Sequence, residues 1–167
     1  MKQLVRHNVF ETNSSSCHSI TISSKDTNLN DIPMPNQSGE IELRSGEFGW
    51  EISEYNGFYE KAAYLIVYIR DWSDKDYIRY REIFERVIKE MTQCETIVYE
   101  PRFWDSEERT YERGGETWSY IEPLGEGYID HQSVGDRDLD YMFEDTEQMK
   151  FFLFNSNSVL YTDNDNH

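Results

Sequence analysis

The spacing of apolar residues along the chain predicts strands towards both ends and helices in the middle. From residue 17 to 23, side chains alternate as in a strand, with His18, Ile20 and Ile22 on one face and the residues between them on the other. From residue 74 to 92, apolar residues recur every three or four positions, which indicates an amphipathic helix. The expected strands are 2–10, 17–23, 40–44, 48–52, 96–99, 117–122, 127–129 and 159–162, and the expected helices are 59–72, 74–92 and 147–154.

Turn signals between these segments predict how neighbouring strands pair. We expect one hairpin between 2–10 and 17–23, and a second between 40–44 and 48–52, joined at Ser45-Gly46. Residues 102–116, which include Gly114-Gly115, form either a surface excursion or a hairpin. Strands, central helices and further strands in this order predict an α+β fold, with a mostly antiparallel sheet packed against two central helices.

Length and composition support one folded unit. The 167 residues are 37% hydrophobic and 15% aromatic, enough for one compact domain over residues 1–162, followed by a disordered acidic tail at 163–167. No apolar run approaches the 18 residues of a membrane helix, and the first residues lack a signal-peptide pattern. Cys17 and Cys94 form no disulfide framework. We therefore expect a reduced, cytoplasmic protein that does not bind membranes.

The charge is strongly negative and unevenly distributed. The chain carries 33 acidic and 16 basic residues, for a net charge of −17, of which −13 falls after residue 94. Because Lys and Arg carry most nucleic-acid binding, direct binding to DNA or RNA is not expected. The charge indicates either a well-solvated surface or mimicry of a nucleic acid towards a basic partner.

One polar stretch joins the first two predicted strands. Residues 9–22 read VFETNSSSCHSITI, and a run of small polar residues precedes Cys17-His18. On one interpretation, these side chains bond to neighbouring backbone groups and form an ordinary turn. On the other, successive N–H groups and hydroxyls form a concavity for an anion such as phosphate, and His18 supplies a proton donor or a second ligand group.

A second polar stretch, GYIDHQSVG at 127–135, begins where a short strand ends. Such positions often hold functional side chains. Strand alternation places His131 and Ser133 on one face, whereas Asp130 next to His131 faces the other way. His131-Gln132-Ser133-Val134 fits half of the pattern of the two-histidine phosphoesterases, but the residues after His18 do not.

Together, the segment FETNSSSxHS (Phe10 to Ser19) and the later DHQS (Asp130 to Ser133) resemble a group of uncharacterised proteins encoded by bacteriophages and some bacteria. This resemblance implies a phage or prophage origin, and hence the cytoplasm of a bacterial host. It implies no mechanism. Two such motifs about 110 residues apart favour two walls of one site over two unrelated turns.

These observations predict a pocket for a small phosphate-bearing ligand or nucleotide, with phosphoester chemistry as an open alternative. The candidate catalytic residues are His18, His131 and Ser133, and the candidate ligand-binding residues are Glu11, Thr12, Asn13, Ser14, Ser15, Ser16, Ser19, Asp130 and Gln132. A serine nucleophile lacks the G-x-S-x-G elbow. His18, His131, Glu11 and Asp130 match no zinc spacing, so no metal site is expected, and no cofactor is indicated.

The alternative hypothesis is an interaction protein whose acidic C-terminal half docks on a basic host protein, with nucleic-acid mimicry as one form of that binding. The densest acidic positions are Glu107, Glu108, Asp136, Asp138, Asp140, Glu144 and Asp145. The four tryptophans, Trp118 among them, are interpreted as core or edge residues rather than as a stacking platform. Whether the protein is an enzyme stays open.

Overall fold

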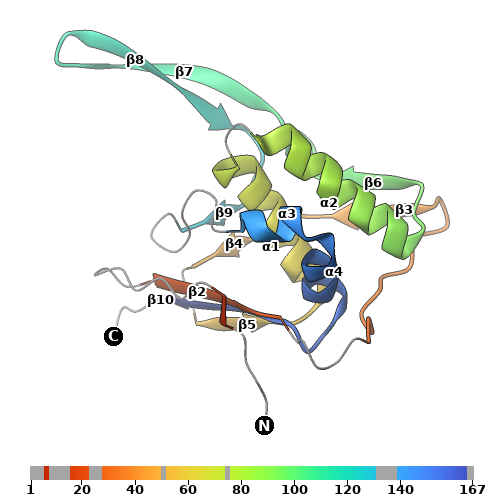
Figure 1. The fold of residues 1–167 in the computed structure, drawn as a ribbon. Helices are drawn as coiled ribbons and strands as arrows, with labels where there is room; N and C mark the ends of the chain where they lie inside the picture. Colours follow the sequence, from red (N-terminus) through yellow and green to blue (C-terminus); the bar gives the residue numbers. More distant parts are fainter. Residues whose placement is uncertain are drawn as a thin grey trace.

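A computed structural model describes residues 6–7, 16–22, 28–49, 52–73, 76–130 and 139–164, and helix α1 (Phe58–Trp72) runs through their centre (Figure 1). Every residue from Lys61 to Ile69 is buried, because this helix is apolar on nearly all of its faces. The helix predicted at 59–72 is therefore confirmed. In the described part of the chain, no helix is long and apolar enough to cross a membrane.

Three further helices pack around α1. Helix α2 (Tyr77–Thr92) buries one side, including Phe84 and Val87, as its apolar repeat predicts. Helices α3 (Asp140–Glu144) and α4 (Thr146–Phe154) follow one another near the C-terminus and contact α2, and α4 also packs on α1. Aromatic rings join these elements: Tyr80 of α2 stacks on Phe143 of α3 with ring centroids 4.0 Å apart.

The main sheet is antiparallel and has the strand order β1-β2-β10-β5. Strand β1 (Arg6–His7) pairs with β2 (Ser16–Thr21) in the predicted hairpin. Strand β10 (Val159–Asn164) lies between β2 and β5 (Ser53–Tyr55), and extends two residues into the predicted tail. The α+β class with a mainly antiparallel sheet is confirmed.

The predicted hairpin between 40–44 and 48–52 is wrong. Strand β3 (Glu40–Leu43) instead pairs in parallel with β6 (Thr96–Tyr99), and β4 (Glu47–Phe48) pairs in parallel with β9 (Tyr128–Ile129). The chain changes partner at Ser45-Gly46, where the Glu100 carboxylate accepts hydrogen bonds from the Ser45 N–H and hydroxyl, and the Gly46 carbonyl accepts from Tyr128 N–H. These partners are distant in sequence, so local turn signals do not reveal them.

A long hairpin extends away from the rest of the fold, as Figure 1 shows. Its strands are β7 (Ser106–Arg113) and β8 (Glu116–Pro123), joined by Gly114-Gly115. Both glycines have positive φ, +65° and +82°, as a two-residue turn matching the strand twist requires. Of the two interpretations of residues 102–116, the hairpin is confirmed.

Candidate functional site

Most of the predicted Ser/His site lies outside the described residues. This applies to Glu11, Thr12, Asn13, Ser14 and Ser15 in the first motif and to His131, Gln132 and Ser133 in the second. Ser16, His18, Ser19 and Asp130 are described. The expected proximity of His18 and His131 therefore stays a prediction. The described residues show only the surroundings of His18.

His18 is held inside the fold by β2. Its side chain is 7% exposed, and its Nδ1 lies 3.0 Å from the hydroxyl of Tyr64 on α1. The Nε2 atom is also buried, and no described residue forms a hydrogen bond with it. Ser16 and Ser19 share this strand, where Ser16 pairs with Asn164 and Ser19 with Tyr161. Because strand side chains alternate, Ser19 faces away from the imidazole of His18.

Asp130, which directly follows β9, lies close to the same imidazole. Its N–H donates to the carbonyl of Phe48 at 2.9 Å, which continues the pairing of β9 with β4. Gly49 lies between them: a Cβ on this glycine would be 2.6 Å from the Cβ of Asp130 and 3.1 Å from Nε2 of His18. Gly49 also has φ of +110°, so only glycine fits this position without strain. The structure thus brings His18 and Asp130 of the predicted site to one point.

The environment of His18 keeps its imidazole uncharged at neutral pH. Burial lowers the pKa of His18 to about 4, and the negative charge of Asp130 offsets only part of this effect. An imidazole with this pKa is not protonated to imidazolium at pH 7, so it is not a general acid there and is only a weak general base. The described surroundings therefore favour a structural hydrogen-bonding role for His18 over proton donation to a phosphoester. Nor does any cluster of three potential metal ligands occur among the residues with described positions.

The hairpin β7–β8 presents a second candidate surface, which we call the aromatic face. Directly paired residues of an antiparallel hairpin share a face, so Tyr111 and Trp118 lie on the same side as Arg109 and Tyr120. The rings of Tyr111 and Tyr120 are 6.0 Å apart. Tyr111, Trp118 and Tyr120 are each about half exposed, at 47%, 50% and 46%. The opposite face carries Thr110, Ser119 and other mostly polar residues.

Charged side chains flank the aromatic face at both ends. Near the base, Arg109 forms ion pairs with Glu107 and Glu122, and at the tip Arg113 is paired in register with Glu116. The hairpin as a whole holds five glutamates and two arginines, a balance of −3. The result is an apolar strip with a mainly acidic border.

The base of the hairpin is firmly attached to the helices. The backbone closes it with a hydrogen bond from Leu124 N–H to the Asp105 carbonyl at 2.9 Å. Just beyond β8, Arg70 of α1 donates to the carbonyls of Gly125, Glu126 and Gly127 at 2.7–3.0 Å. Gly125 is packed so closely on Phe103 that an added Cβ would lie 2.5 Å from the Phe103 Cα. The hairpin thus leaves the fold from a fixed base.

The aromatic face was not predicted from the sequence, although a signal was present. Residues 107–122 alternate around Gly114-Gly115, and this alternation places three aromatic residues on one face. Charged rather than apolar residues fill most other positions, so the segment lacks the usual pattern of a half-buried strand. Trp118 lies on a strand at a sheet edge, as interpreted from the sequence. It is half exposed there, however, beside Tyr111 on the aromatic face.

Comparison with known proteins adds no relative to these observations: no protein-family model, curated protein or solved structure matches the chain.

Proposed function

We propose that this protein is an acidic protein-interaction module that docks on a basic partner protein through the aromatic face of the β7–β8 hairpin. The observation that carries the proposal is the exposure of Tyr111, Trp118 and Tyr120 together on one side of a projecting two-stranded ribbon. Isolated two-stranded hairpins are only marginally stable. Clusters of exposed aromatic residues are typical of binding surfaces rather than of surfaces that contact only solvent. Tyr, Trp and Arg are also the residues most enriched at the energetic centres of interfaces.

The charge of the chain supports the choice of partner. The acidic border of the aromatic face and the net charge of −17 repel nucleic acids and acidic proteins, and steer the molecule towards a surface rich in Lys and Arg. A partner that fits would offer an apolar depression surrounded by basic side chains. The resemblance to phage-encoded proteins supports a bacterial host protein as its source.

The arrangement favours side-chain docking over mimicry of a nucleic acid. Glu107 and Glu108 lie on the hairpin, whereas Asp140, Glu144 and Asp145 lie on or beside α3, which packs on the helical core. The other two predicted positions, Asp136 and Asp138, lie outside the described residues. The described acidic groups are carried by separate elements and do not follow one strand as phosphates do. The attached base supports the same reading, because a pre-positioned hairpin loses less conformational entropy on binding.

The phosphate-site hypothesis for His18, His131 and Ser133 stays a prediction. The described part of that region offers an uncharged imidazole and a carboxylate, neither of which attracts a phosphate. For this reason the hairpin, rather than the Ser/His site, carries the proposed function.

Site-specific photo-crosslinking in bacterial cells tests the proposal. A benzophenone amino acid is placed at Tyr111 on the aromatic face or, as the matched control, at Thr110 on the opposite face. We expect the Tyr111 position to cross-link a basic protein at least fivefold more efficiently than the Thr110 position. The substitution Trp118→Ser should abolish the product in cells, and high salt should abolish it when the cross-linking is repeated in a cell lysate. Equal yields from both faces, a product containing only a second copy of this chain, or an acidic partner would each refute the proposal.

A further inference from the structure

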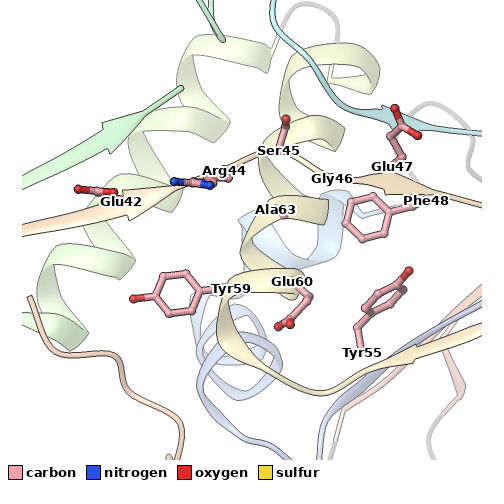
Figure 2. Close-up of a pocket in the computed structure, with 10 residues that line it drawn as sticks. All are labelled: Glu42, Arg44, Ser45, Gly46, Glu47, Phe48, Tyr55, Tyr59, Glu60 and Ala63. Carbon is pink, nitrogen blue, oxygen red and sulfur yellow. The ribbon is translucent and has the colours of Figure 1, made fainter. Parts of the chain in front are cut away.

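A cleft beside Phe48 carries a second inference that is independent of the hairpin. Phe48 packs edge-on against Tyr64, the hydroxyl partner of His18, with ring centroids 5.1 Å apart. It also packs edge-on against Tyr55, at 5.4 Å. The cleft has a volume of about 510 Å³, within the range of small-molecule sites. Its lining, drawn in Figure 2, consists of Glu42, Arg44, Ser45, Gly46, Glu47, Phe48, Tyr55, Tyr59, Glu60 and Ala63.

The walls of the cleft are aromatic and fixed in place. Gly46 allows the Phe48 ring to fold beneath the turn, because a Cβ at this position would lie 2.8 Å from the tip of that ring. Ser45 is anchored by its two hydrogen bonds to Glu100. Tyr59, which is 51% exposed, packs edge-on against buried Phe58. These contacts give the cleft rigid apolar surfaces before any ligand binds.

The charge of the lining selects the ligand. Three carboxylates and one guanidinium line the cleft, which leaves it with a net charge of −2. In Figure 2 the Glu60 carboxylate lies between Tyr59 and Tyr55. Within the described residues, no ion pair engages Glu42, Glu47, Glu60 or Arg44.

Lys61, which follows Glu60 in the chain, forms no ion pair with the Glu60 carboxylate. Its ammonium group is fully buried, where it donates to the carbonyls of Asn155 at 3.0 Å and Ser158 at 3.3 Å and feels the negative charge of Glu60 without forming an ion pair with it. Among the described residues the Glu60 carboxylate therefore lines the cleft without a direct ion pair, although buried Lys61 offsets part of its charge.

We infer that this cleft binds a small organic cation, namely an ammonium group on an apolar stem. The aromatic rings of Phe48, Tyr55 and Tyr59 would cover the stem and attract the positive charge through their faces. Glu60 would pair with the ammonium group. A phosphate or a carboxylate would meet repulsion in the same place.

Calorimetric titration of the full chain at low salt tests the inference with three probes of similar length. These are cadaverine, which is a diamine, 1,5-pentanediol, which is neutral, and glutarate, which is a dianion. We expect saturable binding of cadaverine and none of the other two. Binding of all three alike, or of glutarate best, would overturn the inference.

Substitutions of lining residues of opposite charge should change the affinity for cadaverine in opposite directions. Removing one exposed charge partner changes affinity about threefold to fivefold, so Glu60→Gln should weaken cadaverine binding by that factor. Arg44→Gln removes the competing positive charge and should tighten it, while Glu82→Gln on α2, outside the cleft, should leave it unchanged. All three positions are solvent-exposed, so the variants are expected to fold. An unchanged affinity in Glu60→Gln, or a weaker one in Arg44→Gln, would contradict a cation site.

Discussion

The buried imidazole of His18 makes a quantitative prediction about stability and pH. In the folded protein its pKa is lowered to about 4, whereas in the unfolded chain it returns to 6.5. Between these values the unfolded state binds the additional proton. Stability is therefore fully present above pH 6.5 and is lost as the pH falls towards 4.

The size of the effect follows from the two pKa values. Each pKa unit corresponds to about 1.4 kcal/mol, so the complete transition would cost about 3 kcal/mol. The isoelectric point near 4.5 limits measurements at the acid end, because proteins precipitate when their net charge vanishes. Between pH 7.5 and pH 5.0, His18 should account for a loss of about 2 kcal/mol in the free energy of unfolding.

The assay compares the natural chain with His18→Asn by urea unfolding across this pH range. Asparagine has no titrating group but keeps a short polar side chain that can bond to the Tyr64 hydroxyl, whose distance from Nδ1 is 3.0 Å. Carboxylates distant from position 18 affect both proteins alike, so the difference between their pH slopes reports His18 together with its interaction with Asp130. Parallel slopes, or a His18 pKa above 6 measured by NMR, would refute the reasoning.

Three further substitutions test how the fold positions these sites. Gly49→Ala should cost at least about 3 kcal/mol of unfolding free energy in urea titrations, because its Cβ would collide with Asp130; Gly114→Ala, where the space is open, should cost only about 1–2 kcal/mol. Asp31→Ala removes the carboxylate that accepts from the Phe58 N–H at 2.6 Å at the start of α1. It should lower the free energy of unfolding, measured by thermal denaturation, by about 1–2 kcal/mol. Arg70→Met leaves three carbonyls without their donor and should cost about 2–3 kcal/mol, with faster amide exchange at the hairpin base; full protection there would contradict this role.

Local periodicity was sufficient for the elements whose burial follows their own sequence. The repeat in α2 predicts which side chains of that helix face inward, and the alternation in β2 predicts that His18 and Ile20 share one face, which the structure buries. The α+β class follows from the order of these elements.

Contacts between distant segments were not predictable in the same way. β3 pairs in parallel with β6, and β4 with β9, because the chain changes direction at Ser45-Gly46. Hydrogen bonds to Glu100 and Tyr128 hold this turn in place. The cleft beside Phe48 forms where this turn meets α1 and β5, so no single stretch of sequence contains its pattern. Proximity of His18 and Asp130 was expected from motif resemblance, but their meeting at Gly49 was not.

The most direct test of the proposed function is the affinity for the cross-linked basic partner, once it is purified. Tyr111→Ser combined with Trp118→Ser removes the centre of the aromatic face, and Thr110→Ala combined with Ser119→Ala changes the next pair along the hairpin, on the opposite face. Central aromatic residues of an interface contribute about 2 kcal/mol or more each, so the first pair should weaken binding at least about a hundredfold, and the second less than about threefold. Equal losses from the two pairs, or no loss from the first, would contradict docking through this face.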